Sequence, residues 1–351
     1  MFKQSQEMLG HTSISKYLRY TFDKKEVFIN KYIVVKNMSL KLDVLDKNIL
    51  QELERDSSQP LHILARKIQR SKQFISYRIK RMEDTGFITG YTAMIDVFSL
   101  GYSLFRVYID LQHMQEKEKH NFAEAMKKNP NIISIILVRE QWDLGLFILT
   151  KNIKEFREFW DTILDKYRKN IRNHKVFIYA PVYHYEKSFL PKSIREEKIL
   201  GYGENSSLKA DVKLLFEYAA NVRIPLLLLA KKIKRAPITV KKQLAQLKKE
   251  KIILGHLLEI NPSVLAYHYY IVELTLENIN RREFFNTCKK IPEIYGINRI
   301  IGGADEEIVC MVESKQHLLK IIDQLKEKFP ELKDDKYMEF HPFYSKGIVP
   351  L

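Results

Sequence analysis

The stretch that decides the fold is residues 46–91, "DKNILQELERDSSQPLHILARKIQRSKQFISYRIKRMEDTGFITGY", because its pattern occurs twice in the chain. A shift of 165 residues places it without a gap on residues 211–256, "DVKLLFEYAANVRIPLLLLAKKIKRAPITVKKQLAQLKKEKIILGH". The positions that agree include Pro60 with Pro225, Ala65 with Ala230, and Gly90 with Gly255. A repeat of this length indicates two copies of one structural unit.

Each copy opens with three helical patterns. In the first copy, Asp43 and Asp46 supply acceptors and negative charge at a helix start, Pro60 suits the beginning of the second helix, and Ser71 is a suitable N-cap for the third. The runs that follow, "GFITGYTAMID" and "KIILGHLLEIN", each hold two short β-prone segments about a central glycine, which predicts a hairpin or wing. Three short helices and a hairpin describe a winged helix-turn-helix, whose third helix enters the major groove of DNA.

The back half of each copy alternates strands and helices. "YSLFRVYIDLQH", "NIISIILVR", "DLGLFILT" and "KVFIYAPVYHY" are strand candidates, with helical patterns at 117–128 and 153–168 among them, and the second copy repeats the order. This β-α-β-β-α-β order predicts a ferredoxin-like domain, a four-stranded sheet with helices on one face. The open face needs a cover, so we expect the two sheets to pair, as a pseudo-dimer within the chain or as a homo-oligomer between chains.

The expected fold class is therefore α+β, with two copies of a winged helix-turn-helix followed by a ferredoxin-like domain. A segment rich in charge, Gly and Ser separates the copies. The expected segments are 1–38, a flexible basic tail or an over-extended start; 39–95 and 207–262, the winged helix-turn-helix units; 96–190 and 263–351, the ferredoxin-like oligomerisation domains; and 191–206, a linker.

Composition favours an intracellular protein with an anionic partner. The 351 residues carry a net charge of +16, which indicates nucleic acid or an acidic membrane surface. The longest apolar runs, such as "IPLLLLA" at 224–230, are too short to span a bilayer, and two cysteines, Cys288 and Cys310, form no disulfide framework or metal motif. We expect a cytoplasmic protein that binds double-stranded DNA and no membrane.

The excess positive charge gathers on the segments that would meet DNA. Residues 60–85 hold seven Lys or Arg against two acids, and residues 225–251 hold nine against one. A solvated amphipathic helix is the ordinary explanation of such a run, but repetition of both the charge and the apolar stripe favours nucleic acid. The candidate DNA-binding residues are Lys72, Gln73, Ser76, Tyr77, Arg78, Lys80 and Arg81 in the first copy, and Lys241, Lys242 and Gln246 in the second.

The first copy, "LDVLDKNIL…LHILARKI…SKQFISYRIKRMEDTGFITGYTAMID", resembles the leucine-responsive/asparagine-synthetase regulator (Lrp/AsnC) family of transcriptional regulators. The resemblance covers about residues 40–187 and 206–345 and implies sequence-specific DNA binding with a small effector such as an amino acid. Two features depart from the family pattern. Gln69 and Lys234 replace the usual turn Gly, and Glu140 replaces the effector-loop Gly of the first copy.

In the second copy the effector-loop pattern survives in "GGAD", with Gly302, Gly303 and Asp305 as candidate effector-binding residues. An ordinary β-turn explains these residues equally well. The ten His show no metal-ligand spacing, and no Gly-rich phosphate loop, catalytic residue or cofactor site is indicated. Two rival functions stay open. One is an enzyme resembling siroheme decarboxylases, with a tetrapyrrole held between the sheets; the other is an architectural protein that coats DNA.

Overall fold

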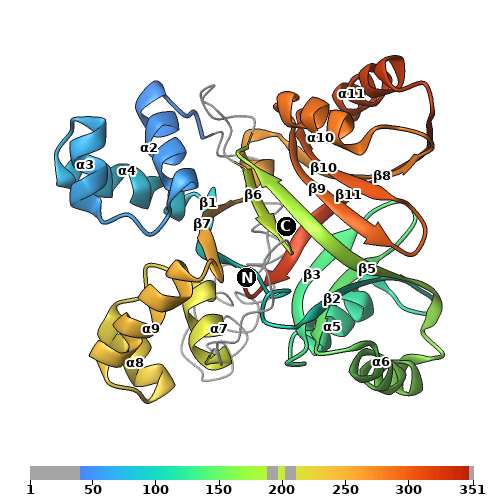
Figure 1. Ribbon diagram of the computed structural model, residues 1–351, viewed down its shortest axis with the longest axis horizontal. Helices are drawn as coiled ribbons and strands as arrows, with labels where there is room; N and C mark the ends of the chain where they lie inside the picture. The colour runs from blue at the N-terminus through green and yellow to red at the C-terminus, as the bar shows by residue number, and fades with distance from the viewer. Residues whose placement is uncertain (1–39, 188–196, 202–210, 348–351) are drawn as a thin grey trace, which may run out of the picture.

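A computed structural model describes residues 40–187, 197–201 and 211–347, and it contains the expected three helices at the front of each half (Figure 1). The predicted tail, residues 1–38, lies outside the described residues. The elements of the first three-helix unit are α2 (Val44–Arg55), α3 (Leu61–Ile68) and α4 (Lys72–Asp84). Those of the second three-helix unit are α7 (Val212–Ala220), α8 (Leu226–Ile233) and α9 (Pro237–Lys249).

The helix starts follow from the predicted capping residues. The Asp43 carboxylate accepts the backbone N–H of Asp46 at 2.8 Å, and the Asp46 carboxylate accepts that of Asp43 at 3.1 Å, which forms a capping box for α2. Ser71 Oγ accepts the backbone N–H of Phe74 at 3.2 Å and begins α4. Asp211 caps α7 through the N–H groups of Lys213 and Leu214. Local hydrogen bonding therefore sets these boundaries.

The hairpin predicted after each third helix is wrong. The structure has one strand there in each half, β1 (Ile88–Ile95) and β7 (Ile253–Ile260), and the two strands pair with each other in an antiparallel two-stranded ribbon. Gly90 and Gly255 lie inside the strands rather than at a turn. The reason is that both runs are largely apolar, and crossing to the other half buries most of both strands.

The ribbon register reveals an approximate two-fold relation between the units. Thr92 pairs with Leu257, which is its own counterpart 165 residues later, so the two-fold axis passes between these two residues. Backbone hydrogen bonds follow the same relation. The bond from Ser57 N to His256 O (3.3 Å) is equivalent to the bond from Val222 N to Tyr91 O (2.9 Å). The bond from Asp96 N to Ile252 O (2.8 Å) is likewise equivalent to the bond from Asn261 N to Phe87 O (2.8 Å).

Behind the ribbon, each half forms four strands and two helices in the predicted β-α-β-β-α-β order. The first half contains β2 (Ser103–Leu111), α5 (Glu116–Met126), β3 (Ile132–Val138), β4 (Leu144–Thr150), α6 (Ile153–Tyr167) and β5 (Ile171–Tyr185). The second contains a short 3₁₀ helix (Pro262–Leu265), β8 (His268–Leu276), α10 (Arg281–Lys290), β9 (Ile294–Ile301), β10 (Glu306–Val312), α11 (Lys315–Lys328) and β11 (Leu332–Ser345).

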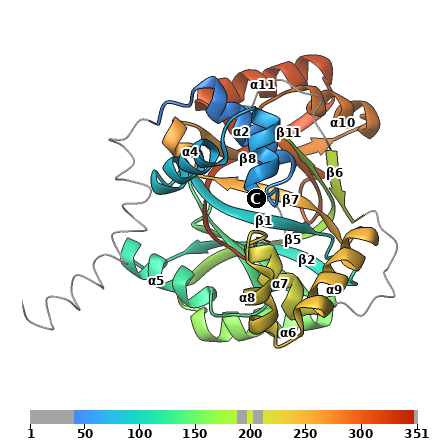
Figure 2. The same cartoon turned by 90° about the vertical axis from the view of Figure 1, so that its left-hand side faces the viewer.

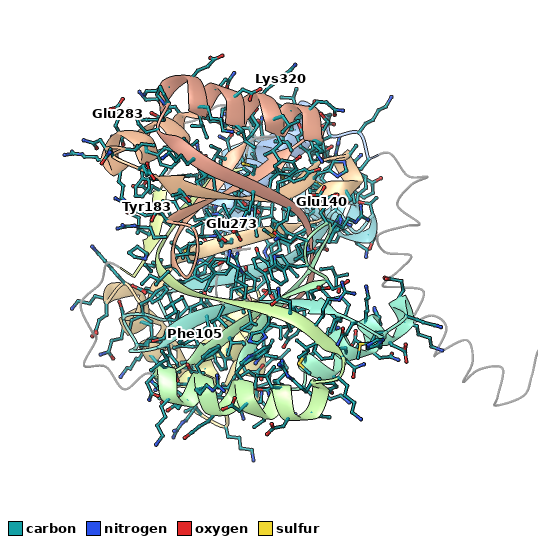
Figure 3. The ribbon with its side chains drawn as sticks, turned by 90° about the vertical axis from the view of Figure 1, so that its right-hand side faces the viewer. Phe105, Glu140, Tyr183, Glu273, Glu283 and Lys320 are labelled. Atoms are coloured by element: carbon teal, nitrogen blue, oxygen red, sulfur yellow. The ribbon has the colours of Figure 1, made fainter. Side chains whose placement is uncertain are left out.

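The two sheets pair within the chain through two long strands. The front of β5 pairs with β2, and its end pairs with β9 of the other half; the front of β11 pairs with β8, and its end pairs with β3. Together with β6 (Glu197–Leu200), the strands form one nine-stranded sheet whose additional β2–β5 pairing closes it. Helices cover the outside, and the sheet faces meet inside, with Lys320 at the outer surface and Glu273 between the layers (Figure 3).

The predicted linker contains structure that its composition did not indicate. Within 191–206, β6 adds to the end of β5, pairing Val182 with Leu200. The next residue, Gly201, donates its N–H to the Asp96 carboxylate at 3.1 Å. Part of the linker is therefore fixed against both the sheet and the segment that follows β1.

Candidate nucleic-acid interface

The two three-helix units lie on the same side of the molecule, away from the outer helices of the sheets (Figure 1). Seen from that side, α4 and α9 lie on either side of the ribbon (Figure 2). The first helix of each unit packs on the ribbon strand of the other unit, α2 on β7 and α7 on β1. The ribbon thus holds two third helices on one face of the protein, as binding to one DNA duplex requires.

Helix α4 separates an apolar face from a polar one as predicted. Ile75, Ile79 and Met82 are buried against the unit. The outward residues that are exposed to solvent are Lys72, Gln73, Ser76, Tyr77 and Lys80. Tyr77 is 67% exposed, although it is a large aromatic side chain that folding usually buries. The exposed set combines amide, hydroxyl and ammonium groups, which are the groups that contact base edges and phosphates.

Arg78 and Arg81 take a different position from the other predicted residues of α4. Arg78 contacts Asp43 at 2.6 Å and Asp46 at 3.2 Å, and Arg81 contacts the fully buried Asp46 carboxylate. The backbone N–H of Asp46 and the Arg78 guanidinium hold the pKa of Asp43 below its usual value. The two arginines therefore join α4 to the start of α2, and their charge is already partly neutralised.

Helix α9 repeats the geometry of α4 with different chemistry. Val240 and Leu247 are buried, whereas Lys241, Lys242 and Gln246 are exposed. The counterparts of Arg78 and Arg81 are Gln243 and Gln246, so α9 itself supplies no arginine to α7. Arg235, just before α9, lies 3.9 Å from the Asp211 carboxylate at the start of α7. Apart from Arg78 and Arg81, the predicted residues thus lie on two comparable exposed helix faces. The face of α4 carries mixed polar groups, and the face of α9 carries lysines beside uncharged residues.

The turn before each third helix has a left-handed residue. Gln69 has φ 56° and ψ 46°, and Lys234 has φ 58° and ψ 48°. Each donates its N–H to the last turn of the preceding helix and ends that helix. Both units therefore use the same turn, at a position that Gly would occupy with less strain.

Polar contacts that the sequence did not reveal join the two units. His256 on β7 lies between Asp56, 2.7 Å from Nδ1, and Tyr218, 3.0 Å from Nε2. On the other side of the two-fold axis, Arg223 donates to the carbonyl of Ser57 at 2.8 Å and stacks over Tyr91. Burial raises the pKa of Asp56, but hydrogen bonds from His256 and Ser58 outweigh it and hold that pKa well below the usual value.

The candidate effector residues have packing roles in the structure. The Asp305 carboxylate accepts the N–H of Leu276 at 2.8 Å, as Asp143 accepts that of Leu111 at 2.7 Å in the first half. Gly302 lies against β5, where a Cβ would come within 2.5 Å of a backbone carbonyl oxygen; a Cβ on Gly303 would meet a lysine side chain at 2.7 Å. At the corresponding turn of the first half, Glu140 adopts φ 84°.

Other kinds of site find little support in the described part of the chain. No group of three or more His, Cys, Asp or Glu in residues 40–187, 197–201 and 211–347 could hold a metal ion. None of the described helices combines the length and apolarity needed to cross a membrane. A cavity between the sheets, bordered by Tyr179, Tyr183, His184 and Tyr295, has a volume of about 30 Å³, which is enough for about two water molecules.

Comparison with known proteins agrees with this geometry. Residues 42–83, which contain α2, α3 and nearly all of α4, match the model of the AsnC-type helix-turn-helix domain. The chain is 31% identical over 118 residues to the proline dehydrogenase transcriptional activator of Rhodobacter capsulatus, covering 33% of this chain and 77% of that protein. It is 29% identical over 126 residues to the HTH-type transcriptional regulator FL11 of Pyrococcus horikoshii, covering 36% and 82%.

A solved structure resembles nearly the whole arrangement of both halves. The siroheme decarboxylase NirDL aligns with 88% of this chain and 93% of its own, with a TM-score of 0.57 and 11% sequence identity. At 11% identity this likeness shows a shared fold, and a shared fold alone assigns no chemistry.

Proposed function

Because the chain belongs to the Lrp/AsnC family of DNA-binding transcriptional regulators, we propose that it binds one DNA duplex with two unequal helix-turn-helix units of the same chain. In this proposal α4 enters one major groove and α9 enters another, about one helical turn away. The family members that pair two identical chains would present two identical helices; here one chain supplies both.

The observation that carries the proposal is the pair of exposed helix faces on one side of the molecule. On α4, Gln73 can bond an adenine edge through its amide, and Lys72 and Lys80 can contact guanine or phosphate. On α9, Lys241 and Lys242 offer point charges that position the protein on phosphates. The bound site is therefore asymmetric, with one half specified sharply and the other loosely.

The test is an affinity titration of the full chain on duplex DNA at several salt concentrations. We expect log affinity to fall linearly with log salt, with a slope set by the number of phosphates neutralised. Gln73→Ala should relax base preference in the sharp half at a cost of about 1–3 kcal/mol, whereas Lys241→Ala should weaken all sequences alike and reduce the slope. Binding that does not respond to salt would refute the proposal.

A small-molecule effector is a further part of the proposed function, with Gly302, Gly303 and Asp305 as its candidate residues. Their packing against β5 and the end of β8 gives a ligand a route to change the sheet pairing. Calorimetric titration of the full chain with each of the common amino acids tests this, with Asp305→Asn as the variant. Heat of binding that persists in the variant would place the effector elsewhere.

The second candidate function is tetrapyrrole decarboxylation, which the shared fold favours. The cavities in the described part of the chain oppose it. The one between the sheets holds about 30 Å³ and the one between the ribbon and the sheet about 60 Å³, and both volumes are far below the roughly 300–1,000 Å³ of pockets for drug-sized ligands. When an iron tetrapyrrole is added to the protein, the visible absorption spectrum of the tetrapyrrole should not shift. A shifted spectrum at equimolar concentration would favour the enzyme over the regulator.

A further inference from the structure

The second three-helix unit exposes large aliphatic side chains at positions where the first unit has His62, the half-buried Ile63 and Gln73. Leu227 and Leu228 on α8 are 72% and 54% exposed, and Ile238 in the first turn of α9 is 61% exposed. The counterpart of Ile238 is Gln73, the amide proposed to read a base in the first half of the site. At this position the second unit has thus replaced a hydrogen-bonding group with one that has neither donor nor acceptor.

The charge around Leu227, Leu228 and Ile238 indicates what class of partner these side chains contact. Residues 225–251 hold nine Lys or Arg against one acid, and Lys231, Lys234, Lys241 and Lys242 are exposed. An aliphatic patch that binds another protein is usually depleted of charge at its centre, whereas a patch among lysines fits a polyanion with apolar groups on its surface. The major groove of DNA is such a surface, because each thymine displays a C5-methyl group there.

Ile238 lies in the first turn of α9, where a recognition helix contacts bases. Residues at the N-terminal end of a recognition helix contact the base edges, and α9 begins at Pro237, one residue before Ile238. The small exposed Ala245, two turns further along, leaves room for close approach to the groove. Resting on the proposed function of this unit, we propose that Ile238 selects thymine methyl groups, so that the loosely specified half of the site prefers T·A pairs at the bases that Ile238 meets.

The test uses the full chain and duplex probes in which thymines of the second half are replaced one at a time by deoxyuridine, which removes only the methyl group. We expect replacement at one or two positions to lower affinity about fourfold, the effect of burying one methyl group. Ile238→Ala should bind the thymine and uracil probes equally, with the affinity of wild type for the uracil probe. Ile238→Val should keep part of the difference.

Matched controls separate this inference from the function on which it rests. Leu227→Ala changes another exposed aliphatic side chain of the same unit, on α8, and should keep the thymine preference. If Lys241→Ala and Lys242→Ala leave affinity unchanged, the second unit does not bind DNA, and the proposed function fails together with the inference. If those variants weaken binding but wild type binds both probes equally, or Ile238→Ala keeps the difference, DNA binding by this unit stands and thymine selection is overturned.

Discussion

At the scale of single residues, Gln69 and Lys234 show that a turn can keep a left-handed backbone without the Gly that suits it best. Both adopt left-handed backbone angles that cost a side-chain-bearing residue energy, and both end a helix through the same hydrogen bonds. The sequence shows that both turns lack the usual Gly. It predicts backbone strain there on the condition that the turn needs a positive φ. Only the structure shows that the turn is kept in both units.

Gln69→Gly should therefore stabilise the protein, because Gly adopts φ near 56° without the Cβ penalty. The expected gain in the free energy of unfolding is on the order of 1 kcal/mol, reduced by the greater freedom of Gly in the unfolded chain. Chemical denaturation measures it, and Gln69→Ala is the control, which should give no gain. A loss of stability in the Gly variant would mean that the Gln69 side chain contributes more than its strain costs.

At the scale of elements, α4 is held by its arginines and α9 is not. Arg78 and Arg81 reach the Asp43 and Asp46 carboxylates of α2, whereas Gln243 and Gln246 stand at their places in the second unit. The sequence predicted the buried and exposed faces of both helices from periodicity alone. It could not separate arginines that face DNA from arginines that face a cap 32 to 35 residues earlier in the chain, because periodicity says nothing about partners distant in sequence.

Arg81→Gln places the second-unit residue in the first unit and should lower the free energy of unfolding by about 1.5–3 kcal/mol, the contribution of a hydrogen bond to a charged group. The expected change in base preference is small, since Arg81 lies against Asp46 rather than on the exposed face. Denaturation and binding-site selection measure the two effects. Sharp loss of preference at unchanged stability would show that Arg81 leaves Asp46 to contact bases.

The hydrogen bond between Asp56 and His256 of the ribbon strand β7 depends on pH. The folded pKa of Asp56 lies below its ordinary value of 3.8, so the stability from this contact is present above about pH 4 and is lost as the pH falls further. The Asp56→Asn variant should therefore lose less unfolding free energy than wild type between about pH 5 and pH 3. Denaturation at several pH values measures this, and parallel pH profiles would contradict it.

At the scale of the whole molecule, the two halves bury opposite charges against each other, so each half fits the other better than it would fit a second copy of itself. Arg106 on β2 and Glu307 on β10 form a fully buried ion pair, and the Tyr179 hydroxyl accepts from Arg106 at 2.8 Å. The pairing registers put Ile271 and Gly145 at the corresponding places of the opposite halves. Two identical first halves would therefore bury Arg106 without an acid, and two identical second halves would bury Glu307 without a base.

Arg106→Met alone should lower the free energy of unfolding by about 3–5 kcal/mol, because it leaves Glu307 buried without a partner. Combining it with Glu307→Leu should recover most of the loss, since apolar replacement of both partners is close to neutral. Denaturation of the single and double variants forms the required cycle. Losses that simply add would show that the two side chains do not stabilise the sheet pairing together.

The repeat, the strand order and the need to cover each sheet could be predicted from the sequence, because each follows from local patterns or their recurrence. The cross-paired ribbon and the strand in the linker could not. Apolar runs such as residues 88–95 fit a hairpin and an exchanged strand equally well in isolation, and the choice depends on how two distant segments meet. The inter-unit contacts of His256 and Arg223 were hidden for the same reason.

The most direct test of the central claim is selection of bound sequences from random duplex DNA with the full chain, followed by a hydroxyl-radical footprint on the selected site. One chain should protect two segments about one helical turn apart, one half sharp in sequence and the other loosely specified and rich in thymine. A strict palindrome with two equally sharp halves, or protection of a single half, would contradict it.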